Sequence, residues 1–214
     1  MKINNNNLKN IWGLVPFDYY EKGVQSNLLQ KFWHNQKIKI FKELVKEMEF
    51  KRILDVGCNS GRMANEIAKI FPKTTVYGVD VHTAAIRFGK KKYSNLKLFV
   101  ADAHRLPFKI NSFDLVVCYE TIEHVVKPLV VLQKIKRVLK KGGVTIIAMD
   151  SGNWLFRIVW FFWENTKGKV WKNAHLHPFK PFELEQIIKM AGLKIIKNKF
   201  SHLGMEVSFL CQKI

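Results

Sequence analysis

Hydrophobic and polar residues follow a regular alternation along most of the chain. From residue 51 onward, short apolar runs rich in β-branched residues are each followed by a segment with apolar residues every three or four positions. The runs predict strands and the segments predict helices. Strands that alternate with helices form a parallel sheet covered on both faces. The predicted strands are RILDVG (52–57), TTVYGVD (74–80), LKLFVAD (96–102), FDLVVCY (113–119) and VTIIAMD (144–150).

Two regions depart from this alternation. Residues 26–50 have apolar residues at helical spacing, which predicts an amphipathic helix with Ser26 as its N-cap. After the fifth strand, about thirty residues lack the alternation, and a segment of that length usually has a function. A helix (FELEQIIKMAG) and two strands (LKIIKNKFS and MEVSFLC) then follow. We therefore expect a tail and helical cover at 1–50, and a domain at 51–214 with a lid insertion at about 151–181.

Composition places the chain among globular proteins. It has 214 residues, of which 48% are hydrophobic and 25% charged, so a full core can form without disulfides. Its three cysteines are far apart, which argues against a disulfide framework or a zinc ribbon. The polar start MKINNNNLKN is not a signal peptide, and no apolar run is long enough to span a bilayer. The expected location is the cytoplasm, with peripheral membrane association left open.

The net charge of +19 is large and is spread along the chain. It permits attraction to nucleic acid, to an anionic membrane or to an anionic substrate. A solvated, lysine-rich surface explains the charge equally well. No appended RNA-binding module is visible, so RNA is the less favoured partner. The sequence does not indicate an oligomeric state.

Polar residues end three consecutive predicted strands. The first strand ends in the turn Asp55-Val56-Gly57-Cys58-Asn59-Ser60-Gly61, the second in Asp80 and the third in Asp102. Small residues in a strand-to-helix turn allow a ligand to approach the backbone, and an acid about 20 residues further on can accept from ribose hydroxyls. Carboxyl ends of parallel strands meet at the ligand edge of an open sheet. The pattern therefore predicts a nucleotide-like ligand.

The set ILDVGCNSG, VYGVD, VADAHRLPF, FDLVVCYETIEHV and LKKGG resembles the class I S-adenosylmethionine-dependent methyltransferases, and most of all the ubiquinone-biosynthesis O-methyltransferases. The resemblance implies a Rossmann-like, seven-stranded, mostly parallel sheet whose last strand is antiparallel. It also implies that Asp80 binds the ribose of the cofactor, that Asp102 binds the adenine amine and that the backbone near Tyr119 closes the site. The full expected set of cofactor-binding residues is Asp55, Gly57, Cys58, Gly61, Asp80, Val81, Asp102, Ala103 and Tyr119.

One residue departs from the family pattern. Asn59 stands where the family usually has a central glycine. Because asparagine tolerates a positive φ better than most residues, we expect the loop to keep its shape. A nicotinamide dehydrogenase is the competing interpretation of this turn, but the chain lacks G-x-G-x-x-G and would leave Asp102 without a role.

The stretch YETIEHV follows the fourth predicted strand. If it turns helically, Glu120, Glu123 and His124 share one face. Two carboxylates and an imidazole can bind Mg²⁺ or another divalent metal, with His175 as a distal ligand implied by the resemblance to small-RNA 2′-O-methyltransferases. Alternatively the acids favour a helix N-terminus, and His124 or His175 is a general base. The expected catalytic residues are His124, Glu123 and His175.

The predicted insertion contains the apolar, aromatic run WLFRIVWFFW (154–163). It is too short to cross a bilayer, but it suits a lid or an interfacial helix. We therefore expect a methyltransferase that acts on a hydroxyl or phenol of a small hydrophobic or lipid-like substrate. The alternatives are a metal-assisted RNA 2′-O-methyltransferase and a cofactor-binding subunit without catalysis of its own.

Overall fold

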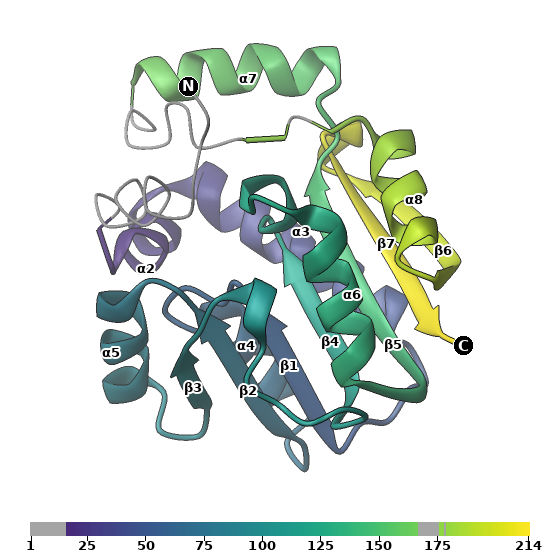
Figure 1. The fold of residues 1–214 in the computed structure, drawn as a ribbon. Helices are drawn as coiled ribbons and strands as arrows, with labels where there is room; N and C mark the ends of the chain where they lie inside the picture. Colours follow the sequence, from purple (N-terminus) through teal and green to yellow (C-terminus); the bar gives the residue numbers. More distant parts are fainter. Residues whose placement is uncertain (1–15, 167–175, 178) are drawn as a thin grey trace.

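A seven-stranded sheet forms the centre of the computed structural model, which describes residues 16–166, 176–177 and 179–214 (Figure 1). The strand order is β3-β2-β1-β4-β5-β7-β6, and β7 alone among these strands runs in the direction opposite to the others. The predicted fold class and the antiparallel last strand are thus confirmed. The strands are β1 (Arg52–Val56), β2 (Thr75–Asp80), β3 (Lys97–Val100), β4 (Phe113–Tyr119), β5 (Leu139–Asp150), β6 (Leu193–Ser201) and β7 (Glu206–Lys213).

Helices cover both faces of the sheet, as the alternating pattern predicts. Ile53 and Leu115 face one core, while Leu54 and Val116 face the other, because successive side chains of a strand point to opposite sides. One face packs against α3 (Leu28–Leu44), α4 (Arg62–Ile70) and α5 (Thr83–Lys92). The other packs against α6 (Pro128–Val138) and α8 (Pro181–Met190).

Within its described part, which begins at residue 16, the amino-terminal cover contains two helices where one was predicted. α2 (Tyr19–Ser26) and α3 are separated by Asn27, whose side chain accepts from the backbone N–H of Leu29 and Gln30. Asn27 is therefore the N-cap of α3, and the prediction that Ser26 caps it is wrong. Ser26 instead ends α2 and donates its hydroxyl to the carbonyl of Lys22.

The transition from α6 into β5 also differs from the prediction. The predicted fifth strand covered residues 144–150, but α6 ends at Val138 and β5 already begins at Leu139. Lys140 pairs with Asp114 of β4 at 2.6 Å, so this part of the chain is already aligned along the sheet. The pairing of β4 with β5 contains a register shift between Phe113 and Leu115, which accommodates the early start.

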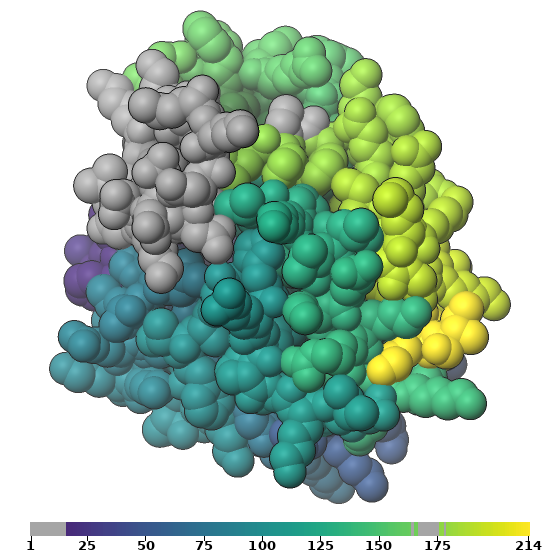
Figure 2. Space-filling model, viewed as in Figure 1, coloured from purple at the N-terminus to yellow at the C-terminus, as the bar shows by residue number. Residues whose placement is uncertain are grey.

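The described part of the predicted insertion contains the helix α7 (Trp154–Asn165), which crosses above the carboxyl ends of β4 and β5 (Figure 1). In the space-filling view it forms the upper edge of the molecule, above α8 (Figure 2). Asn153 caps it by accepting from the N–H of Phe156 at 2.7 Å. In the described ranges, no helix is long and apolar enough to cross a membrane.

Candidate active site

The loop between β1 and α4 adopts left-handed backbone conformations at three positions. The φ angles are 79° at Gly57, 48° at Asn59 and 88° at Gly61. A Cβ atom on Gly57 would lie 2.1 Å from Oγ1 of Thr121, so both the backbone conformation and the packing require glycine there. Asn59 keeps the positive φ at the position where a glycine was expected, as predicted. The loop thus leaves its backbone open toward a ligand.

Asp80, at the end of β2, joins this loop to the start of α5. Its Oδ2 accepts from the N–H of Asn59 at 2.8 Å, and its Oδ1 accepts from the N–H of His82 at 2.8 Å. Burial raises the pKa of Asp80, while these two amides act in the opposite direction. The carboxylate is therefore held in one orientation by both neighbouring loops.

Asp102 follows β3 and is oriented by His104. Its Oδ1 accepts from the N–H of His104 at 2.9 Å and lies 2.6 Å from Nδ1 of the same residue. Nε2 of His104 accepts from the N–H of Lys127 at 3.2 Å. Since Nε2 is an acceptor, the proton of a neutral His104 lies on Nδ1 and is donated to Asp102.

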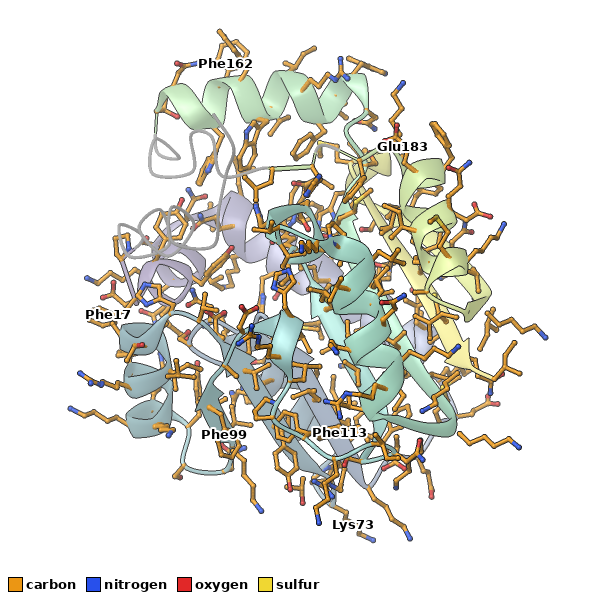
Figure 3. All side chains as sticks on the ribbon, in the orientation of Figure 1. Phe17, Lys73, Phe99, Phe113, Phe162 and Glu183 are labelled. Carbon is orange, nitrogen blue, oxygen red and sulfur yellow. The ribbon has the colours of Figure 1, made fainter. Side chains whose placement is uncertain are left out.

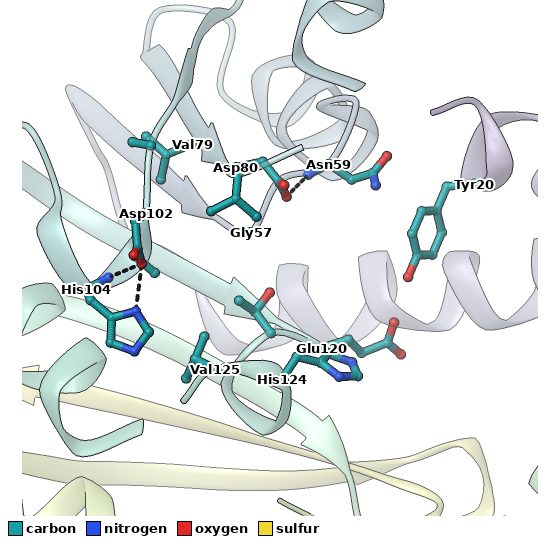
Figure 4. A pocket seen from close by; sticks show the side chains of 14 residues that line it. Tyr20, Gly57, Asn59, Val79, Asp80, Asp102, His104, Glu120, His124 and Val125 are labelled. Atoms are coloured by element: carbon teal, nitrogen blue, oxygen red, sulfur yellow. Dashed lines mark hydrogen bonds and ion pairs between the residues drawn. The ribbon is translucent and has the colours of Figure 1, made fainter. Parts of the chain in front are cut away.

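An open cavity, here called the first cavity, lies between these strand ends. Figure 4 shows Asp80 and Asp102 facing it, with Tyr20, Glu120 and His124 around its other end. Of the predicted cofactor-binding residues, those that line it are Gly57, Asp80, Val81, Asp102 and Ala103. The lining residues that sequence reasoning missed are Tyr20, Asn59, Val79, Ala101, His104, Thr121 and Val125.

Four predicted cofactor-binding residues do not line the first cavity: Asp55, Cys58, Gly61 and Tyr119. The three with side chains are buried, and the Cys58 sulfur lies where a Cβ on Gly78 would approach it to 2.7 Å. Gly61 is the N-cap of α4 with a positive φ, so it shapes the loop. These residues therefore stabilise the loop between β1 and α4 and its surroundings without lining the first cavity.

Asp55 gives the first testable prediction. Burial and then the nearby charge of Asp80 raise the pKa of Asp55 to about 7, and its Oδ2 has no hydrogen-bond partner among the described residues. A carboxyl whose pKa is raised on folding stabilises the fold below its unfolded pKa and loses that contribution as pH rises through about 7. Thermal unfolding of Asp55→Asn should therefore show a smaller fall in Tm between pH 5 and pH 8 than wild type, by several degrees. Glu47→Gln, at an exposed glutamate, is the control and should show the same fall in Tm as wild type. An equal fall in Tm for Asp55→Asn and wild type would refute the raised pKa of Asp55.

Glu21 fixes α2 over the first cavity, which explains why Tyr20 reaches it. Burial disfavours the ionised carboxylate, but hydrogen bonds and positive charges around it hold the pKa of Glu21 below its usual value. The side chain thus joins the amino-terminal cover to the elements that carry the cofactor loop. Its four partners are Ser60 Oγ (3.3 Å), Arg62 Nη1 (2.9 Å), Lys92 Nζ (2.6 Å) and Tyr93 Oη (2.6 Å).

The chain leaves β4 by a left-handed residue, which alters the predicted arrangement of YETIEHV. Glu120 has a φ of 44°, and a short 3₁₀ turn then spans Ile122–His124. The prediction that Glu120, Glu123 and His124 share one helical face is therefore wrong. Glu120 instead accepts from Trp33 Nε1 at 3.1 Å and pairs with Lys37 Nζ at 2.5 Å. Although burial opposes ionisation, these partners from α3 lower the pKa of Glu120.

A second cavity lies beside the first and beneath α7. The two cavities share Tyr20, Glu120 and His124 as lining residues. Most of its wall is apolar or aromatic, and its acidic residues come from the end of β5 and from the segment that follows β4. The remaining lining residues are Tyr19, Val24, Leu29, Gln30, Trp33, His34, Lys37, Glu123, Asp150, Phe156, Val159, Trp160 and Trp163.

Several carboxyl groups beside the second cavity are buried. Burial raises the pKa of Glu123 to about 8 and that of Glu206 to about 7, and it raises the pKa of Asp150 well above its usual value. The Lys37 ammonium lies 3.9 Å from Glu206 and opposes this shift. Neither oxygen of Glu123 has a hydrogen-bond partner within the described residues.

The predicted metal group does not form among the residues that the structure describes. Over those ranges, no three His, Cys, Asp or Glu side chains are placed to hold a metal ion. Glu120 is committed to Lys37, which occupies the position that a cation would take. His175 lies outside the described residues. His177, two residues further along the chain, donates its backbone N–H to the carbonyl of Glu123 at 3.0 Å, so the chain returns to the site at this residue.

The outer side of α7 is apolar as well. Trp154, Phe161 and Phe162 are 72%, 63% and 64% exposed, whereas Phe156 and Trp160 line the second cavity. Figure 3 shows Phe162 on the side of α7 that faces away from the sheet. The helix is thus hydrophobic toward the cavity and toward the solvent.

Known proteins share both sequence and fold with this chain. The methyltransferase domain family matches residues 54–147. A demethylmenaquinone methyltransferase of Geobacillus kaustophilus is 34% identical over 53% of this chain and 52% of its own length, so the chain spans about half of that relative. A ubiquinone/menaquinone biosynthesis C-methyltransferase of Campylobacter jejuni is 24% identical over 76% of this chain and 79% of its own. A solved SAM-dependent methyltransferase of Thermotoga maritima, named as a possible histamine N-methyltransferase, superposes with a TM-score of 0.75 at 23% identity over 97% of this chain and all of its own.

Proposed function

We propose that this chain, whose residues 54–147 belong to the methyltransferase domain family and whose fold is that of class I methyltransferases, transfers a methyl group from S-adenosylmethionine to an acceptor in the second cavity. The acceptor atom is the oxygen of a hydroxyl or phenol on a small hydrophobic or lipid-like molecule. One observation carries the proposal: two adjoining cavities meet at Tyr20, Glu120 and His124. A donor and an acceptor bound side by side would react at that junction.

The first cavity fits an adenosyl ligand. The carboxylate of Asp80 can accept from ribose hydroxyls, and that of Asp102 can accept from an exocyclic amine. The bare backbone at Gly57 leaves room where any side chain would clash with Thr121. S-adenosylmethionine would supply an electrophilic methyl group: a nucleophilic oxygen can attack the methyl carbon while the bond from that carbon to sulfur breaks, and S-adenosylhomocysteine leaves. The residues of this chain bind the donor, orient it and exclude water from it.

His124 is the proposed general base, because it lines both cavities. An imidazole that accepts the hydroxyl proton makes the oxygen more nucleophilic as it approaches the methyl group. Glu120 is held by Trp33 and Lys37, so it shapes the junction and does not take the proton. Glu123 and His175 remain predicted catalytic residues.

A metal-assisted form of the reaction would need Glu120, Glu123, His124 and His175 to converge on one ion. The pairing of Glu120 with Lys37 works against this arrangement, so the proposed reaction uses no metal. We expect turnover to be unchanged, within about twofold, after dialysis against EDTA and removal of the chelator. A loss of at least about tenfold that Mg²⁺ or Mn²⁺ restores would instead support the metal-assisted form.

The substrate class is supported by the aromatic wall of the second cavity and by the quinone-pathway names of two relatives. One of those relatives is named a C-methyltransferase, so a carbon atom beside a phenol is the second candidate acceptor. RNA as acceptor finds less support, because the cavity wall is mostly apolar. A non-catalytic, cofactor-binding chain would bind the donor yet turn over no acceptor.

Tritiated S-adenosylmethionine tests the proposed reaction with a panel of alkyl phenols and their counterparts without a hydroxyl group. We expect label in the phenols only, and mass spectrometry should identify a methyl ether. Label on a ring carbon would support the C-methyl alternative. No label in any acceptor, with donor binding intact, would contradict the proposed catalysis and favour the non-catalytic chain.

The apolar outer face of α7 supports peripheral binding to an anionic membrane. Leu29 and Val159, which line the second cavity, are themselves 73% and 44% exposed, so the apolar rim of the cavity is continuous with this face. The net charge of +19 complements anionic lipid headgroups. An amphipathic acceptor could then enter the second cavity directly from the lipid phase.

Co-sedimentation with vesicles of phosphatidylcholine and phosphatidylglycerol tests this docking. The double variant Phe161→Ser, Phe162→Ser should weaken binding by about tenfold or more, because burial of each phenyl ring stabilises the bound state by about 1.5–3 kcal/mol. Ile110→Ser is the matched control, since Ile110 is 64% exposed but precedes β4, at the opposite end of the sheet. Absence of wild-type binding at low salt would end the membrane proposal.

A further inference from the structure

The second cavity concentrates carboxylates in a chain that is otherwise strongly basic. The sequence holds 36 Lys+Arg against 17 Asp+Glu. Even so, Glu120, Glu123 and Asp150 line this cavity, and Lys37 is the one Lys or Arg among its described lining residues. Glu206 approaches the same ammonium at 3.9 Å. The polar floor of the cavity therefore has fewer cations than carboxylates.

Lys37 does not pair with Glu123, and this carboxyl group also lacks a hydrogen-bond partner among the described residues. Nζ of Lys37 lies 2.5 Å from Oε1 of Glu120, so this ammonium already pairs with that carboxylate. Glu123 is only 3% exposed, yet neither of its oxygens has a hydrogen-bond partner in the described part of the chain. A buried polar group without a partner costs free energy. A cationic donor bound there would remove this cost, and its charge would lower the pKa of Glu123, which burial raises to about 8, so that the side chain is a carboxylate in the complex.

The aromatic residues of the wall indicate the sign of the charge on that ligand. Tyr19, Tyr20, Trp33, Trp160 and Trp163 all line the second cavity. The faces of aromatic rings attract cations, and Trp does so most strongly. An anionic ligand would be repelled by the carboxylates, and a neutral hydroxyl would gain little from the rings. Carboxylates combined with aromatic faces favour an ammonium group.

We propose that the methyl acceptor carries a protonated amine, which the Glu123 carboxylate binds at the floor of the second cavity. This inference rests on the proposed methyl transfer, because it names the substrate class of the same site. The ammonium donates to Glu123, and the aromatic rings enclose it. The hydroxyl that receives the methyl group lies toward His124, where the two cavities meet. Glu123 is thus a specificity-determining residue.

Two matched probes test the proposal. Tyramine and 4-hydroxyphenethyl alcohol share a phenol and a two-carbon chain, and they differ in an ammonium against a hydroxyl. Each is titrated calorimetrically into the protein saturated with S-adenosylhomocysteine at pH 7.5. We expect tyramine to bind roughly tenfold or more tightly, since one desolvated ammonium–carboxylate contact has at least that effect.

The variant Glu123→Gln should reduce this preference to within about twofold, because the amide keeps the size of the side chain and removes its charge. Glu123→Asp keeps the charge and should retain an intermediate preference. Glu185→Gln, which alters a glutamate of α8 paired with Lys189, is the control and should keep the full preference. The affinity of each variant for S-adenosylhomocysteine reports whether its fold is intact.

Equal affinity for the two probes, tighter binding of the alcohol, or a preference that survives in Glu123→Gln would each overturn the proposal. Failure of both probes to bind would also overturn it, provided that S-adenosylhomocysteine binds normally. The proposed methyl transfer would then still stand. If S-adenosylhomocysteine itself does not bind, the proposed function fails first, and the separate titration distinguishes the two cases.

Discussion

Replacement of Asp80 by asparagine should weaken the binding of S-adenosylhomocysteine by about 100-fold. The carboxylate now accepts from the N–H groups of Asn59 and His82, and its remaining lone pairs face the first cavity. An amide would place an NH₂ group against one of these N–H donors and would lose the charge that strengthens hydrogen bonds to ribose hydroxyls. Hydrogen bonds to a charged group contribute about 1.5–3 kcal/mol each, and 1.4 kcal/mol corresponds to a factor of ten.

Isothermal titration calorimetry measures this effect, and Asp114→Asn provides a matched control. Oδ2 of Asp114 also accepts from two backbone N–H groups, those of Lys51 and Arg52, but it does so at the opposite edge of the sheet. The control should bind S-adenosylhomocysteine within about twofold of wild type. Wild-type affinity in Asp80→Asn would remove Asp80 from the donor site.

Replacement of His124 by alanine should lower turnover by about 10²–10⁴-fold, which is the usual contribution of a general base. The measurement is a single-turnover assay with saturating S-adenosylmethionine and the best acceptor of the phenol panel. The affinity for S-adenosylhomocysteine should change little, because Asp80 and Asp102 hold the donor. The loss should appear in the rate of the chemical step and not in donor binding.

His177→Ala separates a chemical role of His124 from a general effect of imidazoles in this region. The backbone N–H of His177 donates a hydrogen bond to the carbonyl of Glu123. Its imidazole ring stacks on the ring of Phe179, with the two ring centroids 5.2 Å apart. The backbone contact persists in an alanine variant, so turnover should fall by much less than in His124→Ala. A His124→Ala enzyme that keeps wild-type turnover would show that another group, or none, takes the proton.

The fold could be predicted largely because its strands are short, apolar and β-branched and are separated by amphipathic segments. Such local patterns fix both the class of the fold and the edge where ligands bind. Asp80, Asp102 and Gly57 were identifiable for this reason, since each lies at the end of a strand or within two residues after it. Helix boundaries were harder to predict, and Asn27, not Ser26 as predicted, is the N-cap of α3.

The second cavity was much harder to foresee. Trp33 and Lys37 reach Glu120 from α3, and Trp33 is separated from Glu120 by 87 residues in the sequence. No local spacing encodes a contact of this kind, because the docking of the amino-terminal helices on the sheet decides it. The left-handed backbone at Glu120 likewise depends on its surroundings, and the predicted helical turn failed there.

The dispersed positive charge and the acidic cavity floor have separate roles in this account. Exposed lysines set the sign of the molecular surface, whereas Glu120, Glu123 and Asp150 set the sign at the acceptor. A ligand attracted to the surface need not resemble the ligand of the cavity. An anionic membrane outside and an ammonium inside are therefore compatible.

The most direct test of the central claim is a crystal structure of the chain with S-adenosylhomocysteine. The account predicts the ribose within hydrogen-bond distance of the Asp80 carboxylate, the adenine amine near Asp102, and the sulfur directed toward His124 at the mouth of the second cavity. Density for the ligand at any other place, with the cavity beside Gly57 empty, would contradict it.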